Sequence, residues 1–227
     1  MNKIFLSVLL LLPALFPVQG QSWRALQQQA QKRGELASAR QIILLDSTAV
    51  SVAPSGTGTF TINKVILVQN RSGALANRVL KYDYDLTAFA EFHRVNIYKA
   101  NGEVRPVDVG KTLDYTAPAR MIYWGARQIM LELGRLDPGD IIEYEIHKKG
   151  FTYALLTDQP DEERFVPPMR GQFYDIVPFW CDDPTMRKVY SVTLPREKEM
   201  QFQFYQGECA SSMRYENDRK VYTFAKN

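Results

Sequence analysis

The pattern of apolar and polar positions changes in kind near residue 40. Residues 22–39 are rich in Ala, Gln, Leu, Arg and Lys, contain no proline, and predict one short helix with a break at Gly34. From residue 41 onward, apolar and polar side chains alternate in short runs, which is typical of strands. The runs 41–53 and 59–70 flank a turn-forming stretch, Pro54 to Gly58, and therefore predict a β-hairpin.

The alternation continues to the end of the chain. Two or three strands are expected within 78–109, where Asn101-Gly102 predicts a type I′ hairpin turn. Further strands are expected at 128–133, 141–150, 188–194, 200–205, 211–215 and 220–225, with turns at 136–140 and at Asn217-Asp218. The sequence therefore predicts an all-β fold, an antiparallel β-sandwich-like domain with a short N-terminal helix and long loops.

Two segments lack any clear period and carry many aromatic residues. They are 110–127 and the proline-rich stretch 157–184, where we expect long ordered loops. Rings exposed on such loops can stack on sugars or peptides and anchor interfaces, whereas rings that point inward plug the ends of the sandwich. The residues for which both roles stay open are Tyr115, Tyr123, Trp124, Phe173, Tyr174, Phe179 and Trp180.

The first twenty residues have the order of a secretory signal peptide. Lys3 supplies a positive charge, Ile4 to Phe16 is almost wholly apolar, and small or modest residues, Val18 and Gly20, stand at the positions that a signal peptidase reads. The apolar run is shorter than the ~20 residues that a membrane-spanning helix needs. An uncleaved anchor is the alternative.

Signal cleavage sets the expected organisation of the chain. Residues 1–20 are the signal peptide, 21–39 a short helical preface and 40–227 the β domain. We expect an exported protein, periplasmic or extracellular, with no membrane span once the signal is removed. Its net charge of +3 falls by one when Lys3 is lost. A balance so close to neutral favours neither nucleic acid nor anionic lipid as a partner.

Only two cysteines are present, Cys181 and Cys209. In an exported protein they could form a disulfide, which would stabilise the fold by about 3 kcal/mol in the chain-entropy model. The alternative is two separate thiols packed as small apolar residues. Neither has a helix N-terminus or a basic cluster beside it to lower the pKa of a nucleophilic thiol.

Few other residues suggest chemistry. The two histidines, His93 and His147, each lie in a predicted strand, and neither belongs to a short zinc-binding motif. A zinc site would have to be assembled from distant strands, so we predict no metal and no other cofactor. No nucleophile-elbow motif or phosphate-binding glycine loop occurs. The sequence therefore does not predict an enzyme.

The order of several motifs resembles a known family. They are ILLDST (43–48), YDYD (82–85), AFAEFHRVNI (88–97), Asn101-Gly102-Glu103, LELGRLDPGDIIEYEI (131–146) and VTLPREKEMQFQF (192–204). From about Arg40 to Asn227 the chain is similar to the transglutaminase-associated N-terminal domain of unknown function found in exported bacterial transglutaminase-like proteins.

This resemblance implies a β-sandwich-like domain with no catalytic residues of its own. In such proteins a transglutaminase-like domain with a Cys, His and Asp triad normally comes next, and we expect that domain to begin about where this chain ends, at Asn227. The triad is not transferred to Cys181 or Cys209, because both lie inside the β domain.

Three functional hypotheses follow. The first is an exported, non-catalytic accessory or binding domain that recognises a peptide, a glycan or a partner protein such as a transglutaminase-like domain. The second is a purely structural domain of an envelope protein. The third is a cysteine-dependent enzyme that combines Cys181 or Cys209 with His93 or His147.

Overall fold

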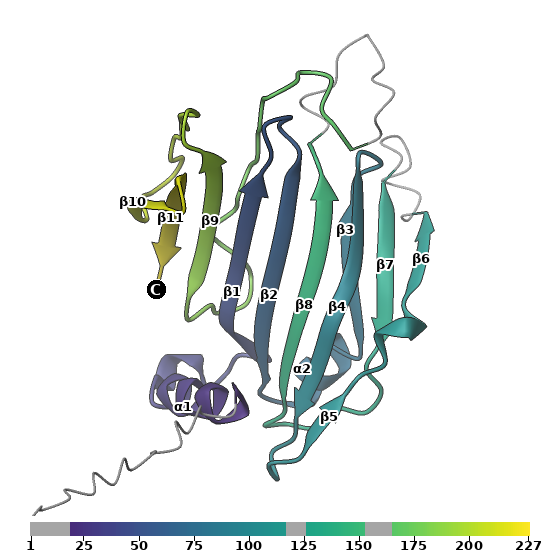
Figure 1. The fold of residues 1–227 in the computed structure, drawn as a ribbon. Helices are drawn as coiled ribbons and strands as arrows, with labels where there is room; N and C mark the ends of the chain where they lie inside the picture. The colour runs from purple at the N-terminus through teal and green to yellow at the C-terminus, as the bar shows by residue number, and fades with distance from the viewer. Residues whose placement is uncertain (1–18, 117–125, 153–164) are drawn as a thin grey trace, which may run out of the picture.

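The computed structural model describes residues 19–116, 126–152 and 165–227, and these form two β-sheets (Figure 1). The strands are β1 (Gln41–Val52), β2 (Gly58–Val68), β3 (Val79–Tyr84), β4 (Ala88–Tyr98), β5 (Val104–Pro106), β6 (Leu113–Thr116), β7 (Arg127–Glu132), β8 (Ile141–Gly150), β9 (Lys188–Pro195), β10 (Ala210–Glu216) and β11 (Arg219–Lys226). The helices are α1 (Gln19–Gln31) and α2 (Arg71–Ala76), with 3-10 turns at Gly34–Leu36 and Val109–Lys111.

The expected all-β fold is confirmed. Within the described residues, one sheet has eight strands in the order β10-β11-β9-β1-β2-β8-β4-β5, and the other has three in the order β3-β7-β6. The first predicted hairpin is present, since β1 and β2 pair antiparallel from Gln41↔Val68 to Val52↔Gly58. None of the described helices has the length and apolar character needed to cross a membrane.

One strand pair differs from the expected antiparallel pattern. β9 lies parallel to β1, with Asp46 opposite Lys188. A parallel neighbour requires a long connection that returns the chain to the same end of the sheet. Residues 165–187 make that return, because Gly171 donates to the Ser55 carbonyl near one end of β1 and the Pro184 carbonyl accepts from Ile43 near the other.

The large sheet has one face that is covered along most of its width, which we name the covered face. Over β2, β8 and β4 it packs against the three-stranded sheet (Figure 1). Over β1, β9 and β11 it packs against side chains from the connections on either side of β9, including Phe173, Phe179 and Met200. The alternation predicted for the strands supplies both clusters, since every second residue of each strand points to this face.

Among the described residues, the opposite side, which we name the open face, is covered at one end by α1. Trp23, Leu26 and Ala30 pack there against a cluster that includes Leu44, Leu67 and Ile141. The predicted N-terminal helix is therefore present and buries part of the sheet. Beyond the helix, most residues of β4 and β8 that point to this face are polar; Glu91 and His93 are exposed, and His147 is half-buried.

Two sequence predictions about local structure are wrong. Residues 200–205 alternate like a strand but pair with no other strand; Phe202 and Phe204 instead lay their rings against Phe224, with centroids 4.9 and 6.0 Å away. Residues 113–116, inside the stretch 110–127 expected to be irregular, form β6 and pair with β7. Residues 71–76 form the short helix α2, because the Asn70 side chain accepts a hydrogen bond from the Gly73 amide and caps it.

The type I′ geometry expected at Asn101-Gly102 is found instead at the last predicted turn, Asn217-Asp218. Gly102 has a positive φ of 93°, but Asn101 does not, so Asn101-Gly102 is not a type I′ turn. Asn217 and Asp218 both have positive φ, 47° and 59°, and join the paired ends of β10 and β11 as a two-residue loop. The type I′ geometry therefore belongs to Asn217-Asp218.

Candidate functional site

The strongest cluster of chemically active side chains lies on the open face, where β4 and β8 run side by side. Each strand carries a glutamate and a histidine separated by one residue, Glu91 with His93 and Glu145 with His147. Residues two apart on a strand point to the same face, so each pair is presented on one side of the sheet. The antiparallel register places Glu91 directly opposite His147.

A β-bulge completes the arrangement. The register shifts between Phe92, which pairs with Ile146, and Arg94, which pairs with Glu145, so His93 is the extra residue. A bulge lets two consecutive side chains share a face. The contacts show this, because His93 and Arg94 both reach Glu145.

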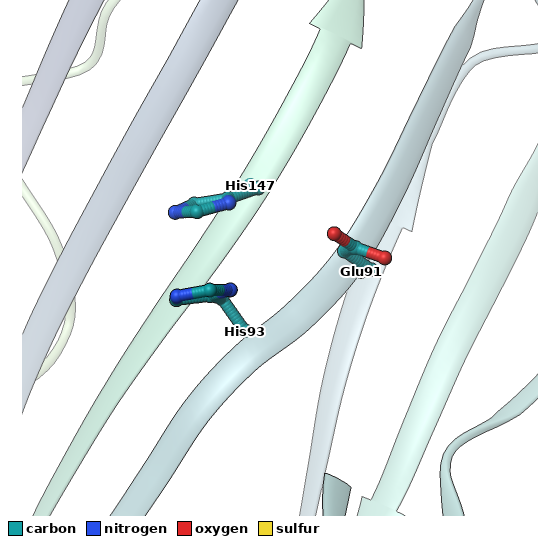
Figure 2. Close-up of side chains that lie close together, drawn as sticks. All are labelled: Glu91, His93 and His147. Atoms are coloured by element: carbon teal, nitrogen blue, oxygen red, sulfur yellow. The ribbon is translucent and has the colours of Figure 1, made fainter. Parts of the chain in front are cut away.

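The two imidazole rings are stacked, with centroids 4.0 Å apart and planes 14° from parallel. Figure 2 shows the Glu91 carboxylate beside this stack. One ligand atom from each of Glu91, His93 and His147 lies within 4.8 Å of the other two. The His93 side chain is 55% exposed and that of His147 37%, so solvent reaches the cluster.

Glu145 contacts both histidines of the stack. Its Oε1 lies 2.7 Å from His147 Nε2 and 4.0 Å from His93 Nε2. Its other oxygen, Oε2, lies 3.4 Å from an Arg94 nitrogen. Glu91, His93, Glu145 and His147 together form what we name the Glu-His quartet.

A buried acid lies next to the quartet. Glu143 is 3% exposed, and its Oε2 accepts a hydrogen bond of 2.5 Å from the Tyr98 hydroxyl. Burial, followed by this hydrogen bond, raises the pKa of Tyr98 to about 12. Arg94 also lies 3.8 Å from Glu143. Two carboxylates, Glu91 and Glu145, therefore lie beside the histidine pair, and the Arg94 guanidinium links Glu145 to the buried Glu143.

The aromatic residues singled out in the sequence divide between the two roles left open. Phe173 and Phe179 pack against the covered-face core, whereas Tyr174 and Trp180 are exposed. Tyr115 lies half-buried on β6 and donates to the Gln128 side chain. Tyr123 and Trp124 lie outside the described residues.

Cys181 and Cys209 are both free thiols in the structure, so the disulfide considered from sequence is not formed here. Cys181 is exposed and contacts the Asp183 carbonyl at 2.8 Å and Thr185 Oγ1 at 3.0 Å. Cys209 packs against the covered-face core, and burial raises the pKa of its thiol. A cysteine-dependent enzyme would need a histidine beside one of these thiols. The contacts found for His93 and His147 are instead with each other and with Glu145.

Sequence reasoning noted both histidines but did not bring them together. Two Glu-x-His pairs, each inside an alternating strand, were the available signal. Their meeting depends on the pairing of two strands far apart in sequence, which sets Glu91 opposite His147, and on the bulge at His93. Neither feature can be derived from short motif spacing.

Comparisons with known proteins concern the fold. A protein described as "a putative protease from Parabacteroides distasonis" is 9% identical, with a TM-score of 0.62 over 82% of this chain and 35% of its own. An M1 zinc metallopeptidase from Deinococcus radiodurans is 12% identical, with a TM-score of 0.39 over 85% of this chain and 40% of its own. A Legionella pneumophila aminopeptidase A is 7% identical, with a TM-score of 0.39 over 83% of this chain and 21% of its own.

This chain therefore spans only a minor part of each of these solved proteins, about a third of the first. No curated protein sequence matches it. A family model does match, over residues 54–227. That match includes the strands of the quartet and agrees with the expected resemblance to a domain of unknown function. Because it extends over most of the sequence, the chain belongs to the family described as "Domain of Unknown Function with solved-structure structure (DUF3857)".

Proposed function

We propose that this chain is a non-catalytic accessory domain of an exported protein and that it binds a partner protein domain. The observation that carries the proposal is a group of exposed apolar side chains on the two connections around β9 and on the edge strand β10. We name it the aromatic surface; its members are Tyr174, Ile176, Trp180, Phe202, Tyr205, Met213 and Tyr215.

These large apolar side chains lie largely in solvent and are not buried by other described parts of the chain. Trp180 is 75% exposed and Tyr205 is 80% exposed. Both connections pack their inward residues on one core cluster, so their outward residues lie on the same side of the molecule. Large apolar side chains gathered on a surface mark protein interaction sites, with aromatic residues as the usual anchors.

The edge of the large sheet adds a second means of attachment. β10 pairs only with β11 among the described strands, and all seven of its residues are exposed. An edge strand carries unpaired backbone groups that accept a further strand from a partner. A polypeptide partner can therefore combine backbone pairing with contacts to Met213 and Tyr215.

The comparisons support a role inside a larger assembly. The fold occupies 35% of the solved Parabacteroides distasonis chain, which is described as a putative protease. With the sequence resemblance, this favours a transglutaminase-like domain as the partner, and the signal-like residues 1–20 favour export to the periplasm or beyond. The thiols favour a non-catalytic role, because burial raises the pKa of Cys209 and Cys181 contacts oxygen atoms.

A purified transglutaminase-like domain from the same organism is the partner to test, by isothermal titration calorimetry. We expect saturable binding that weakens by about thirtyfold or more when Trp180→Ser and Tyr205→Ser are combined, since even one buried aromatic anchor contributes about 2 kcal/mol or more. Phe89→Ser is the matched control, because Phe89 is an exposed aromatic residue on the open face.

Equal weakening by the control would contradict the assignment of the surface. Absence of binding to this domain, and to cell-wall peptides and glycans at high concentration, would contradict the accessory role and favour the purely structural alternative.

A further inference from the structure

The Glu-His quartet lies on the open face, away from the aromatic surface, and its chemistry does not depend on the proposed partner. Imidazole nitrogen and carboxylate oxygen are the ligands that first-row divalent metals, zinc above all, take from proteins. We propose that Glu91, His93 and His147 bind one divalent transition-metal ion. Zn²⁺ is the ion we assign, because three such ligands leave one tetrahedral position for water or another ligand.

The spacing of the donors suits such an ion. Bonds of about 2.0–2.1 Å around tetrahedral zinc place its ligand atoms roughly 3.3 Å apart. The three donors already lie within 4.8 Å of one another. Rotation of the exposed side chains closes the remaining distance, so the backbone of β4 and β8 need not move.

The surroundings of His147 have the form expected of a metal ligand. A metal-binding histidine usually gives its second ring N–H to a carboxylate, which fixes the ring and strengthens the donor nitrogen. Glu145 Oε1 lies 2.7 Å from His147 Nε2. With the proton on Nε2, the lone pair is on Nδ1 and available to the metal. Glu145 is itself held by Arg94, so it acts as a positioning residue.

Local charge also favours a cation. Glu91, Glu143 and Glu145 bring three carboxylates to this part of the open face, against two cations, Arg94, which contacts two of them, and Lys149, two residues beyond His147. The β2 residues opposite β8 here, Thr61 and Asn63, are neutral. The alternative to a metal site is an ion pair between Glu145 and a protonated histidine. In that case the residues would have no affinity for zinc.

Isothermal titration calorimetry with Zn²⁺ alone separates the two roles, on full-length protein prepared without a histidine tag. We expect one ion per chain. His93→Gln and His147→Gln should each lower the affinity by about tenfold or more, and the double variant, which has no imidazole left, should abolish binding. Both substitutions are at solvent-accessible positions, so the circular dichroism spectra of all three variants should be unchanged.

The carboxylate ligand has a matched control. Glu91→Gln should weaken zinc binding by about tenfold, whereas Glu132→Gln, an exposed carboxylate on β7 paired with Arg78, should have no effect. No heat of binding up to about 1 mM zinc would overturn the proposal. Binding that persists in the double histidine variant would overturn it equally, since the ion would then be held by other groups.

Discussion

The two faces of the eight-stranded sheet are built from the same strands, but one forms a packed core and the other presents polar side chains to solvent. On the covered face, β4 and β8 present Phe92, Ile142 and Ile146 to the three-stranded sheet. On the open face, the same two strands present Glu91, His93 and His147 to solvent. Burial allows only well-packed apolar residues, whereas a rigid surface supported from behind can hold polar groups in fixed positions. The covered face thus stabilises a platform on which the quartet is arranged.

Adjacent residues on β8 give the sharpest test of this difference. Ile146 is 1% exposed in the covered-face core, and its neighbour His147 points the other way. Ile146→Ala should lower the free energy of unfolding by roughly 2–5 kcal/mol because it leaves a cavity. His147→Ala should lower it by less than about 1 kcal/mol. Urea denaturation measures both, and comparable losses would contradict the division between the faces.

β4 and β8 approach each other closely at Gly150, in the same part of the ladder that places Glu91 opposite His147. Gly150 has φ 151°, and a Cβ there would lie 2.4 Å from the Thr87 carbonyl oxygen and 2.6 Å from Ala88 Cα. Gly150→Ala should therefore cost about 2 kcal/mol of unfolding free energy through strain, measured by thermal unfolding.

The matched control for that strain is Gly102, which also has a positive φ but no atom within 4 Å of an added Cβ. Gly102→Ala should cost only about 1 kcal/mol, from its backbone conformation alone. If the two variants lost the same stability, close packing of β4 on β8 would not be what requires glycine at position 150.

The buried acid beside the quartet gives a smaller, pH-dependent effect. Tyr98→Phe removes the hydroxyl that donates to Glu143 and should cost about 1 kcal/mol at neutral pH. The pKa of Tyr98 is raised from 10 to about 12, so the folded state favours the protonated phenol. Its contribution is complete below pH 10 and is lost as the pH rises through 12.

The stability difference between the wild type and Tyr98→Phe should consequently be constant below pH 10 and shrink above it. Chemical denaturation across that range measures it, and comparison with the variant removes the contribution of other tyrosines. A difference that grew with alkaline pH would contradict the role of the Tyr98–Glu143 hydrogen bond.

Much of the fold could be predicted from alternation, because alternation reports which side chains face a core. It correctly gave the first hairpin and the strands from residue 188 onward, except 200–205. There Phe202 and Phe204 alternate because they pack on Phe224, although their backbone pairs with no strand. Both rings stay exposed, Phe202 by 51%, so alternation here reports a side-chain contact and predicts neither burial nor strand pairing.

The quartet could be predicted only in part. Glu91 with His93, and Glu145 with His147, each share a face by spacing alone. That the two pairs meet depends on the β4–β8 register and on the bulge after Phe92, which are properties of the assembled sheet. The connection before β9 likewise could not be predicted from sequence alone, because packing in the assembled fold determines that Phe179 points inward and Trp180 outward.

The proposed metal site on the open face is tested most directly by nuclear magnetic resonance of the imidazole nitrogens. The chain contains only two histidines, so the wild-type spectrum reports His93 and His147 alone. One equivalent of Zn²⁺ should shift one nitrogen of each ring together and fix the tautomer of both, with the Nε2 proton of His147 retained toward Glu145. Resonances that do not move, or a shift of one ring without the other, would contradict the account.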